Sequence, residues 1–294
     1  MEVRAGDVVF FRSQGPVAAA QRMLDGADVD RVALALGSNR IALVVGDAIV
    51  LGALEQEPSA VRRLKANADL APVVARAHEL AESGPAACGA PEIGLALFAA
   101  SRKARVTPSW HALQRAAFEA AAAVLKEPTP LTPAQFVWRC FDDALPEQND
   151  VYTLRINDLQ NFEVVAGVPA NPGAGVSRRY GRGVHPESTL AWAAQPLIRP
   201  RLATATGAPV PADLVRACAA WIEECHGGTV AGAPARAEGD ALLVSLQKLA
   251  HAWSGAQPAL AKGTLPAQLE LLFRSAADLA TPGDLMRCED LFTV

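Results

Sequence analysis

An α+β fold is the class that this sequence predicts, because strand patterns dominate its beginning and helical patterns its later part. Val8–Phe11 is a run of apolar, strand-favouring residues. Three more short strands are expected behind it, at Val32–Leu36, Ile41–Val45 and Ala48–Leu51. Gly, Ser, Asn and Asp fill the breaks between these three strands, as is typical of tight turns. We therefore expect a small antiparallel sheet near the N-terminus.

Several helices are expected to pack on this sheet or beside it. Val17–Leu24 carries apolar residues at helical spacing. Ser109–Leu125 is rich in Ala and other good helix formers, and Ser109 is its candidate N-cap. Three C-terminal helices are expected, at Pro211–Cys225, Ala241–Trp253 and Pro266–Leu279. The segments with weaker or loop-like signals are Ala60–Leu80, Gly84–Pro91 and the linker Gly227–Gly239.

The clearest helix start in the sequence is at Thr132. Pro133 follows at the first helical position, where its missing N–H costs nothing, and Gln135 stands at the third. Thr and Gln at this spacing predict a capping box. The helix is expected to run to about Leu145 and to pack against the sheet.

Composition is that of a water-soluble globular chain. Hydrophobic residues make up 51%, charged residues 20%, and the net charge is −4. The mildly acidic charge balance gives no electrostatic reason to expect nucleic-acid binding, and no apolar run reaches the length of a membrane span. Five cysteines, an odd number without short paired spacing, favour a reducing compartment. With no leader-like N-terminus, we expect a cytoplasmic protein.

Neither a cofactor nor a metal is predicted. The glycines between residues 173 and 175 lack the flanking strand and the Lys-Ser/Thr of a phosphate loop. Cys218 and Cys225 are too far apart along one helix to share a tetrahedral ion. The five tryptophans are too dispersed to form a stacking platform.

Three segments together resemble a known superfamily. They are Gly6–Gly37, which begins Gly-Asp-Val-Val-Phe-Phe, Leu131–Phe141, and the tail Thr281–Leu285 with its Thr-Pro-x-Asp-Leu pattern. This combination is similar to the circularly permuted NlpC/P60 papain-like group, which includes YiiX-like and lecithin retinol acyltransferase-like proteins. The resemblance implies a single papain-like domain over residues 1–294, with a helical insertion at about 211–256. It also implies ancestral thiol chemistry on an amide or ester.

The reactive positions of that pattern are substituted in this chain. Arg31 stands where the family pattern has its histidine, Pro133 where it has its cysteine, and Gly52-Ala53 where it often has a carboxylate. Proline has no nucleophile, and a permanently protonated arginine cannot act as a base. We therefore expect a catalytically degenerate domain, a binding or regulatory pseudoenzyme for an unknown small molecule, peptide or protein. Arg31, Gln135 and Arg12 are its candidate ligand-binding residues, although Arg31 could instead pair with Asp28 or Asp30.

Two alternatives stay open from the sequence. An active thiol hydrolase or acyltransferase would need a displaced pair, Cys140 or Cys88 with His111 or His185. A buried, inert Cys140 is the favoured interpretation of that residue. A structural or interaction subunit would instead expose an apolar patch, expected on the C-terminal helices. The basic loop Arg178–Arg182 could contact an anion or simply be solvated.

Overall fold

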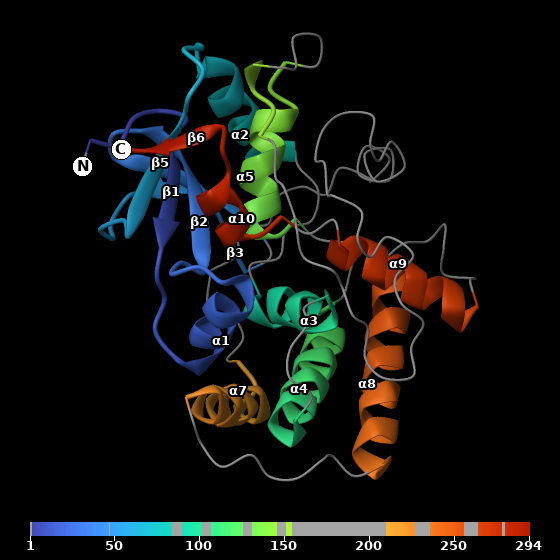
Figure 1. The fold of residues 1–294 in the computed structure, drawn as a ribbon. Coiled ribbons are helices and arrows are strands. Elements are labelled where there is room, and N and C mark those ends of the chain that lie inside the picture. The colour runs from blue at the N-terminus through green and yellow to red at the C-terminus, as the bar shows by residue number, and fades with distance from the viewer. Residues whose placement is uncertain are drawn as a thin grey trace.

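The computed structural model describes residues 2–46, 48–83, 90–101, 107–125, 131–145, 151–154, 210–226, 236–255, 264–277 and 280–294. These residues form an antiparallel sheet, helices packed against it and a second group of helices beside it, which confirms the α+β class (Figure 1). The N- and C-terminal residues lie near each other at the sheet (Figure 1). The C-terminal tail therefore completes the same unit that the N-terminal strands begin.

Six antiparallel strands form the sheet in the order β4-β3-β2-β1-β5-β6. The strands are β1 (Val8–Phe11), β2 (Arg31–Gly37), β3 (Arg40–Val45), β4 (Ala48–Ala53), β5 (Ala60–Leu64) and β6 (Leu291–Thr293). The four strands predicted from the sequence are confirmed as β1 to β4. The weak segment Ala60–Leu80 instead contains β5, and β6 was not predicted. Strand β1 lies inside the sheet and is buried along its whole length.

Nine helices are present in the described part of the chain. They are α1 (Pro16–Asp25), α2 (Ala71–Ser83), α3 (Pro91–Ser101), α4 (Pro108–Val124), α5 (Pro133–Asp142), α7 (Ala212–Cys225), α8 (Arg236–Gly255), α9 (Leu265–Ala277) and α10 (Pro282–Arg287). The predicted N-cap of α4 was wrong: Thr107 Oγ1, not Ser109, accepts the Trp110 N–H at 3.2 Å. Pro108 can therefore occupy the first helical position.

Two other boundaries differ from the sequence expectation. Helix α5 ends at Asp142, earlier than Leu145, and Asp143 is its C-cap. Helix α8 begins at Arg236, inside the segment assigned as a linker. The Ala and charged residues that follow Ala235 are good helix formers, which outweighs the single Gly239 in this stretch.

One face of the sheet packs on α5 and α2. Alternate residues of a strand point to opposite faces, so Val8 and Phe10 lie on this side together with Leu34. Phe136 and Phe141 of α5 fill the space opposite them and are fully buried. Val9 and Phe11 belong to a smaller cluster on the other face. The helix predicted from Thr132 thus packs against the sheet as expected.

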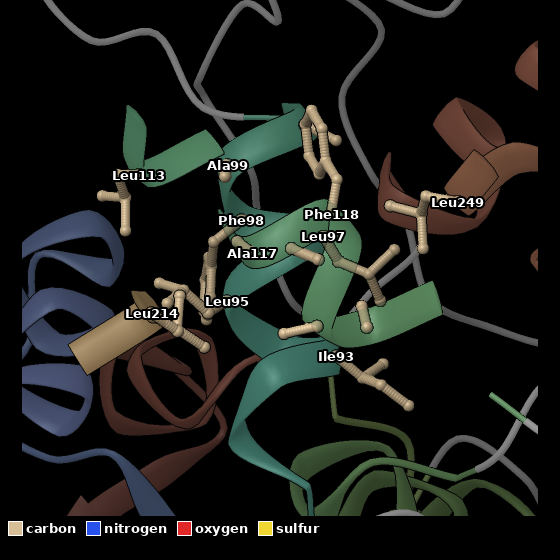
Figure 2. Close-up of a cluster of buried hydrophobic side chains, with 14 of the residues drawn as sticks. Ile93, Leu95, Leu97, Phe98, Ala99, Leu113, Ala117, Phe118, Leu214 and Leu249 are labelled. Atoms are coloured by element: carbon tan, nitrogen blue, oxygen red, sulfur yellow. The ribbon is translucent and has the colours of Figure 1, made fainter. Parts of the chain in front are cut away.

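The second core is helical. Helix α3 lies among α1, α4 and α9, and α4 also contacts α7 and α8. Figure 2 shows the side chains that join these elements: Ile93 and Leu97 of α3, Phe118 of α4, Leu214 of α7 and Leu249 of α8. Helix α3 is apolar around most of its circumference, as a helix surrounded by others must be. Two helices lie in the segment predicted as an insertion, 211–256: α7 packs on α1 and α4, and α8 packs on α4 and α9.

The Gly6-Asp7 pair at the start of β1 has a structural explanation. Gly6 has φ +84, and a Cβ there would lie 2.5 Å from Leu70 Cδ1. Asp7 is fully buried and accepts hydrogen bonds from Arg63 Nε at 2.7 Å and Arg63 Nη2 at 2.8 Å. It also accepts the Arg4 N–H at 2.8 Å. A two-point arginine–carboxylate pair therefore ties the turn before β1 to β5.

Candidate functional site

A cavity of about 260 Å³ lies where the sheet meets the helical layer. We call it the Arg31 cavity, after a residue at the first position of β2. Its wall also includes Pro133 of α5, Val17 of α1, Phe98 of α3 and Thr281 beside α10. Segments from both ends of the chain and from its middle thus meet at one site. In particular, Arg31 and Pro133, the two residues singled out from the sequence, line the same cavity.

The first turn of α5 forms the wall that carries Pro133. The predicted capping box is confirmed: Gln135 N donates to Thr132 Oγ1 at 3.3 Å, and Thr132 N donates to Gln135 Oε1 at 3.3 Å. Pro133 occupies the first helical position, and Ala134 behind it also lines the cavity. The side chain of Gln135 serves the cap and does not line the cavity. This placement gives no support to its predicted role in ligand binding.

Arg31 is exposed, and its guanidinium carbon lies 5.8 Å from the centroid of the Phe11 ring. That is within the range of a cation–π contact. The aspartates that could have paired with it have other partners. Asp30 Oδ1 accepts from Arg22 Nη1 at 2.6 Å and from Ser13 N at 2.9 Å.

Asp28 faces Arg12 at 4.0 Å between exposed side chains. Arg12 does not line the Arg31 cavity, so its predicted role in ligand binding gains no support either. Arg31 itself forms no ion pair with any residue that the structure describes. Among the described charged groups in the cavity wall, the Arg31 guanidinium is therefore the one without an ion-pair partner.

Asp25, at the end of α1, forms the wall near α10. Its buried carboxylate accepts from Thr281 Oγ1 at 2.7 Å and from Gly283 N at 2.6 Å, and Arg287 Nη2 lies 3.5 Å away. Thr281 and Asp284 also form a capping box for α10. The Thr-Pro-x-Asp-Leu tail thus holds Asp25, and with it the end of α1, against the cavity.

The pKa of Asp25 is raised, first by burial and next by the negative charge of Asp284. The hydrogen bonds from Thr281 and Gly283 and the charge of Arg287 act in the opposite direction. Burial prevails over these stabilising contacts. Asp25 is consequently a carboxyl group whose charge is costly in the folded protein.

No cysteine or histidine lines the Arg31 cavity among the described residues. Cys140, deeper in α5, is fully buried in the sheet-side core, as expected, and burial raises the pKa of its thiol well above the usual value. His111 lies in the first turn of α4, within the helical layer. Cys88, His185 and the basic loop Arg178–Arg182 lie outside the described residues. The described wall of the Arg31 cavity therefore contains no thiol–imidazole pair.

The structure also bears on the sequence expectations about metal ligands, membrane-spanning helices and exposed apolar residues. Cys218 is buried in the helical core, whereas Cys225 is exposed. The described residues contain no group of three or more potential metal ligands. Within them, no helix is both long and apolar enough to cross a membrane. Among the side chains of α8 and α9 that the structure describes, the exposed large apolar ones are Val244 and Leu265.

Sequence reasoning located Arg31 and Pro133 but missed most of the wall around them. Asp25 and Phe98 face the cavity from elements that pack only in the folded chain. The sequence signal for α3 was its continuous apolar run from Ile93, which periodicity alone does not assign to a helix. A comparison of the chain with protein-family models, curated proteins and solved structures finds no match.

Proposed function

We propose that this chain is a catalytically degenerate papain-like domain, of the permuted NlpC/P60 type, that binds a small molecule in the Arg31 cavity. The observation that carries the proposal is the meeting of Arg31 and Pro133 in one cavity wall. These residues come from the two separate segments in which the family pattern has its base and its nucleophile. The proposal keeps the cleft of such a domain and assigns it to binding instead of catalysis.

The residues in the wall support the loss of thiol chemistry. Pro133 has neither a nucleophilic side chain nor an N–H at the first helical position. Arg31 stays protonated across the physiological pH range and so cannot accept a proton from a nucleophile. Cys140 points into the core, and its raised pKa keeps the thiol neutral and unreactive. The described wall can bind and orient a molecule but supplies no nucleophile of the papain kind.

The size of the cavity supports a ligand of metabolite size. Pockets for drug-sized ligands are commonly about 300–1,000 Å³, so this cavity of about 260 Å³ lies just below the lower end of that range. An apolar protein cavity of about 150 Å³ is sufficient for benzene, so 260 Å³ corresponds to about ten non-hydrogen atoms. Apolar side chains, among them Val17, Val44 and Phe98, make up most of the wall. This surface suits a compact ligand with a substantial apolar part.

A cavity-filling variant tests the binding proposal. Ala18 lines the Arg31 cavity from α1, whereas its neighbour Ala19 does not. We expect at least one of octanoate, octanamide and octylamine to bind the wild-type protein in ligand-observed NMR titrations. Ala18→Met should abolish that binding, and the matched control Ala19→Met should retain it. Absence of binding by all three probes, or equal binding by the two variants, would refute the proposal.

The catalytic half of the proposal needs a separate measurement. Hydrolysis of p-nitrophenyl octanoate should proceed at the same rate with the wild-type protein and with Cys140→Ser. Iodoacetamide at neutral pH should modify no cysteine faster than it does in the guanidinium-unfolded chain. A cysteine-dependent rate above that of the variant, or a hyper-reactive thiol, would favour the displaced-pair enzyme instead.

A further inference from the structure

The outer edge of strand β4 is an interaction surface, and we infer that its partner is a second copy of this chain. Two copies pair β4 with β4 in antiparallel orientation, around a two-fold axis that passes through Leu51. Their sheets are then joined edge to edge. No residue of β4 is among the described residues that line the Arg31 cavity, so this inference does not depend on what the cavity binds.

The backbone of β4 has one bonded side and one open side. The strand lies at one end of the sheet, and its pairing with β3 continues over all six residues without a register shift. Just beyond the strand, Leu54 N donates to Asn39 O at 3.1 Å. Because residues of an antiparallel strand alternate between bonding one side and the other, the even-numbered residues bond β3. The residues whose N–H and C=O groups point outward, and form no hydrogen bond to another described residue, are Ile49, Leu51 and Ala53.

Strand β4 lacks the features that usually keep an edge strand from pairing. Such features are charged side chains, a proline, a bulge or a very short strand. The sequence of β4 is Ala-Ile-Val-Leu-Gly-Ala, its first five residues are half-buried, and Ala53 is exposed. The opposite edge of the sheet, β6, has only three residues. The longer and unprotected edge is therefore β4.

The sequence of β4 is complementary to itself around Leu51. Antiparallel pairing about that residue uses all three outward-pointing residues, with Ile49 opposite Ala53 of the second copy and the reverse. Val50 then lies opposite Gly52 of the second copy, at a Cα separation of about 4.5 Å. A Cβ at Gly52 would meet no atom of this chain within 4 Å, so the monomer does not require glycine there. A glycine inside a strand often marks the close approach of another backbone, and the second copy provides one.

Charge and symmetry are consistent with a dimer as the end product. No residue of β4 is charged, so self-pairing brings no like charges together within the strand. The contact uses the same edge of both copies and is closed, whereas pairing of β4 with β6 would continue into a filament. Six residues per copy are fewer than the about 20–30 residues per partner of a standard interface. The dimer is therefore weak and depends on protein concentration.

Sedimentation velocity of the full-length protein, from low micromolar to several hundred micromolar, tests the inference with charged variants of Val50. In the paired strands the two copies of this residue are diagonal neighbours across the axis. Val50→Lys and Val50→Glu should each weaken dimerisation about tenfold, and their equimolar mixture should associate more tightly than either alone, because the charges are then opposite. The matched control is Phe292→Lys, at an exposed apolar residue of β6, which should dimerise like the wild-type protein.

Amide hydrogen exchange by NMR tests the same pairing without a variant, and so decides even if a charge at position 50 prevents folding. The amides of Ile49, Leu51 and Ala53 should become slower to exchange as protein concentration rises. Those of Val50 and Gly52, which already bond β3, should be protected at every concentration. A dimer in which the odd-numbered amides stay unprotected would overturn the assignment to β4.

Other results would also overturn the inference. One is a wild-type protein that remains monomeric at several hundred micromolar. Another is a dimer that Phe292→Lys disrupts and Val50→Lys leaves intact, since the pairing edge would then be β6. If the chain stays monomeric but a synthetic peptide of residues 46–55 protects the odd-numbered amides, the edge accepts a strand and the second copy is the wrong partner.

Discussion

Gly283→Ala is the sharpest test of how the C-terminal tail is attached. Helix propensity alone predicts that Ala stabilises α10, by up to about 1 kcal/mol. The structure predicts the opposite sign. A Cβ at Gly283 would lie 2.5 Å from Asp25 Oδ1 and 2.6 Å from Asp25 Cγ, closer than such atoms can approach. The buried carboxylate would have to move, and its hydrogen bonds from Thr281 and from Gly283 N would be broken or distorted.

The expected change in the free energy of unfolding follows from those contacts. A hydrogen bond to a buried charged group contributes about 1.5–3 kcal/mol, and overpacking adds about 1–3 kcal/mol. After subtracting the gain in helix propensity, we expect Gly283→Ala to lower the free energy of unfolding by about 3 kcal/mol. Urea denaturation followed by circular dichroism measures this difference directly.

Two controls isolate the clash. Gly94→Ala, also inside a helix, would place its Cβ 3.2 Å from the Gln21 Nε2 atom, which needs to shift by only a few tenths of an ångström, so a much smaller effect is expected. In an Asp25→Ala background the carboxylate is absent, and Gly283→Ala should cost less than about 1 kcal/mol. A Gly283→Ala protein as stable as wild type, or an equal loss in both backgrounds, would show that the tail is not held in this way.

Three further predictions concern Asp25, Asp7 and Pro133. Because the pKa of Asp25 is raised above its unfolded value, its stabilising contribution is full at pH below about 3.8 and is lost as pH rises through the folded value. Urea titrations at several pH values should show the wild-type protein losing stability relative to Asp25→Asn over that rise, and a stability difference independent of pH would contradict this prediction. Asp7→Asn breaks the buried pair with Arg63 and should lower the free energy of unfolding by about 3 kcal/mol. Glu2→Gln, whose partner Arg4 is exposed, should leave the urea midpoint unchanged. Pro133→Cys, made in a Cys88→Ser/Cys225→Ser background, should carry a thiol whose pKa lies below the usual value of about 8.5, because it sits at the N-terminus of α5 near the Arg31 charge. The pH dependence of its alkylation rate measures that pKa, and an unshifted value would show that the helix start does not favour a thiolate.

The sequence predicted the elements whose signals are local. Strands β1 to β4 are apolar runs separated by turn residues, and α5 begins with a capping box that is legible in Thr132 and Gln135. Strand β5 was missed because Arg62 and Arg63 interrupt its apolar pattern. Arg63 is nevertheless accommodated, since it pairs with the buried Asp7 of a neighbouring segment. The sequence around Arg63 could not predict this pairing, because Asp7 lies 56 residues away along the chain.

The same reason limits prediction of the site. Arg31 and Pro133 could be singled out because each stands in a segment with a recognisable pattern. Their neighbours in the wall could not, since the contact between Asp25 and Thr281 spans 256 residues of sequence. Neither Arg12 nor Gln135 lines the cavity, although both stand in the segments that carry the recognisable patterns. A place in such a segment was therefore a poor guide to the cavity-facing side chains.

Pro133 and Arg31 are compatible with a stable fold, whereas the cavity beside them lowers stability. Pro133 suits the first position of α5, and the Arg31 side chain is exposed and takes no space in the core. An apolar cavity, however, leaves buried methyl groups such as that of Ala18 without full contacts. Filling it with Ala18→Met should raise the free energy of unfolding by about 1 kcal/mol, while Ala19→Met should have little effect. If Ala18→Met both loses ligand binding and is more stable than the wild-type protein, then stability does not account for the cavity, and ligand binding does. A destabilised Ala18→Met would instead show that the wall has no room for additional atoms.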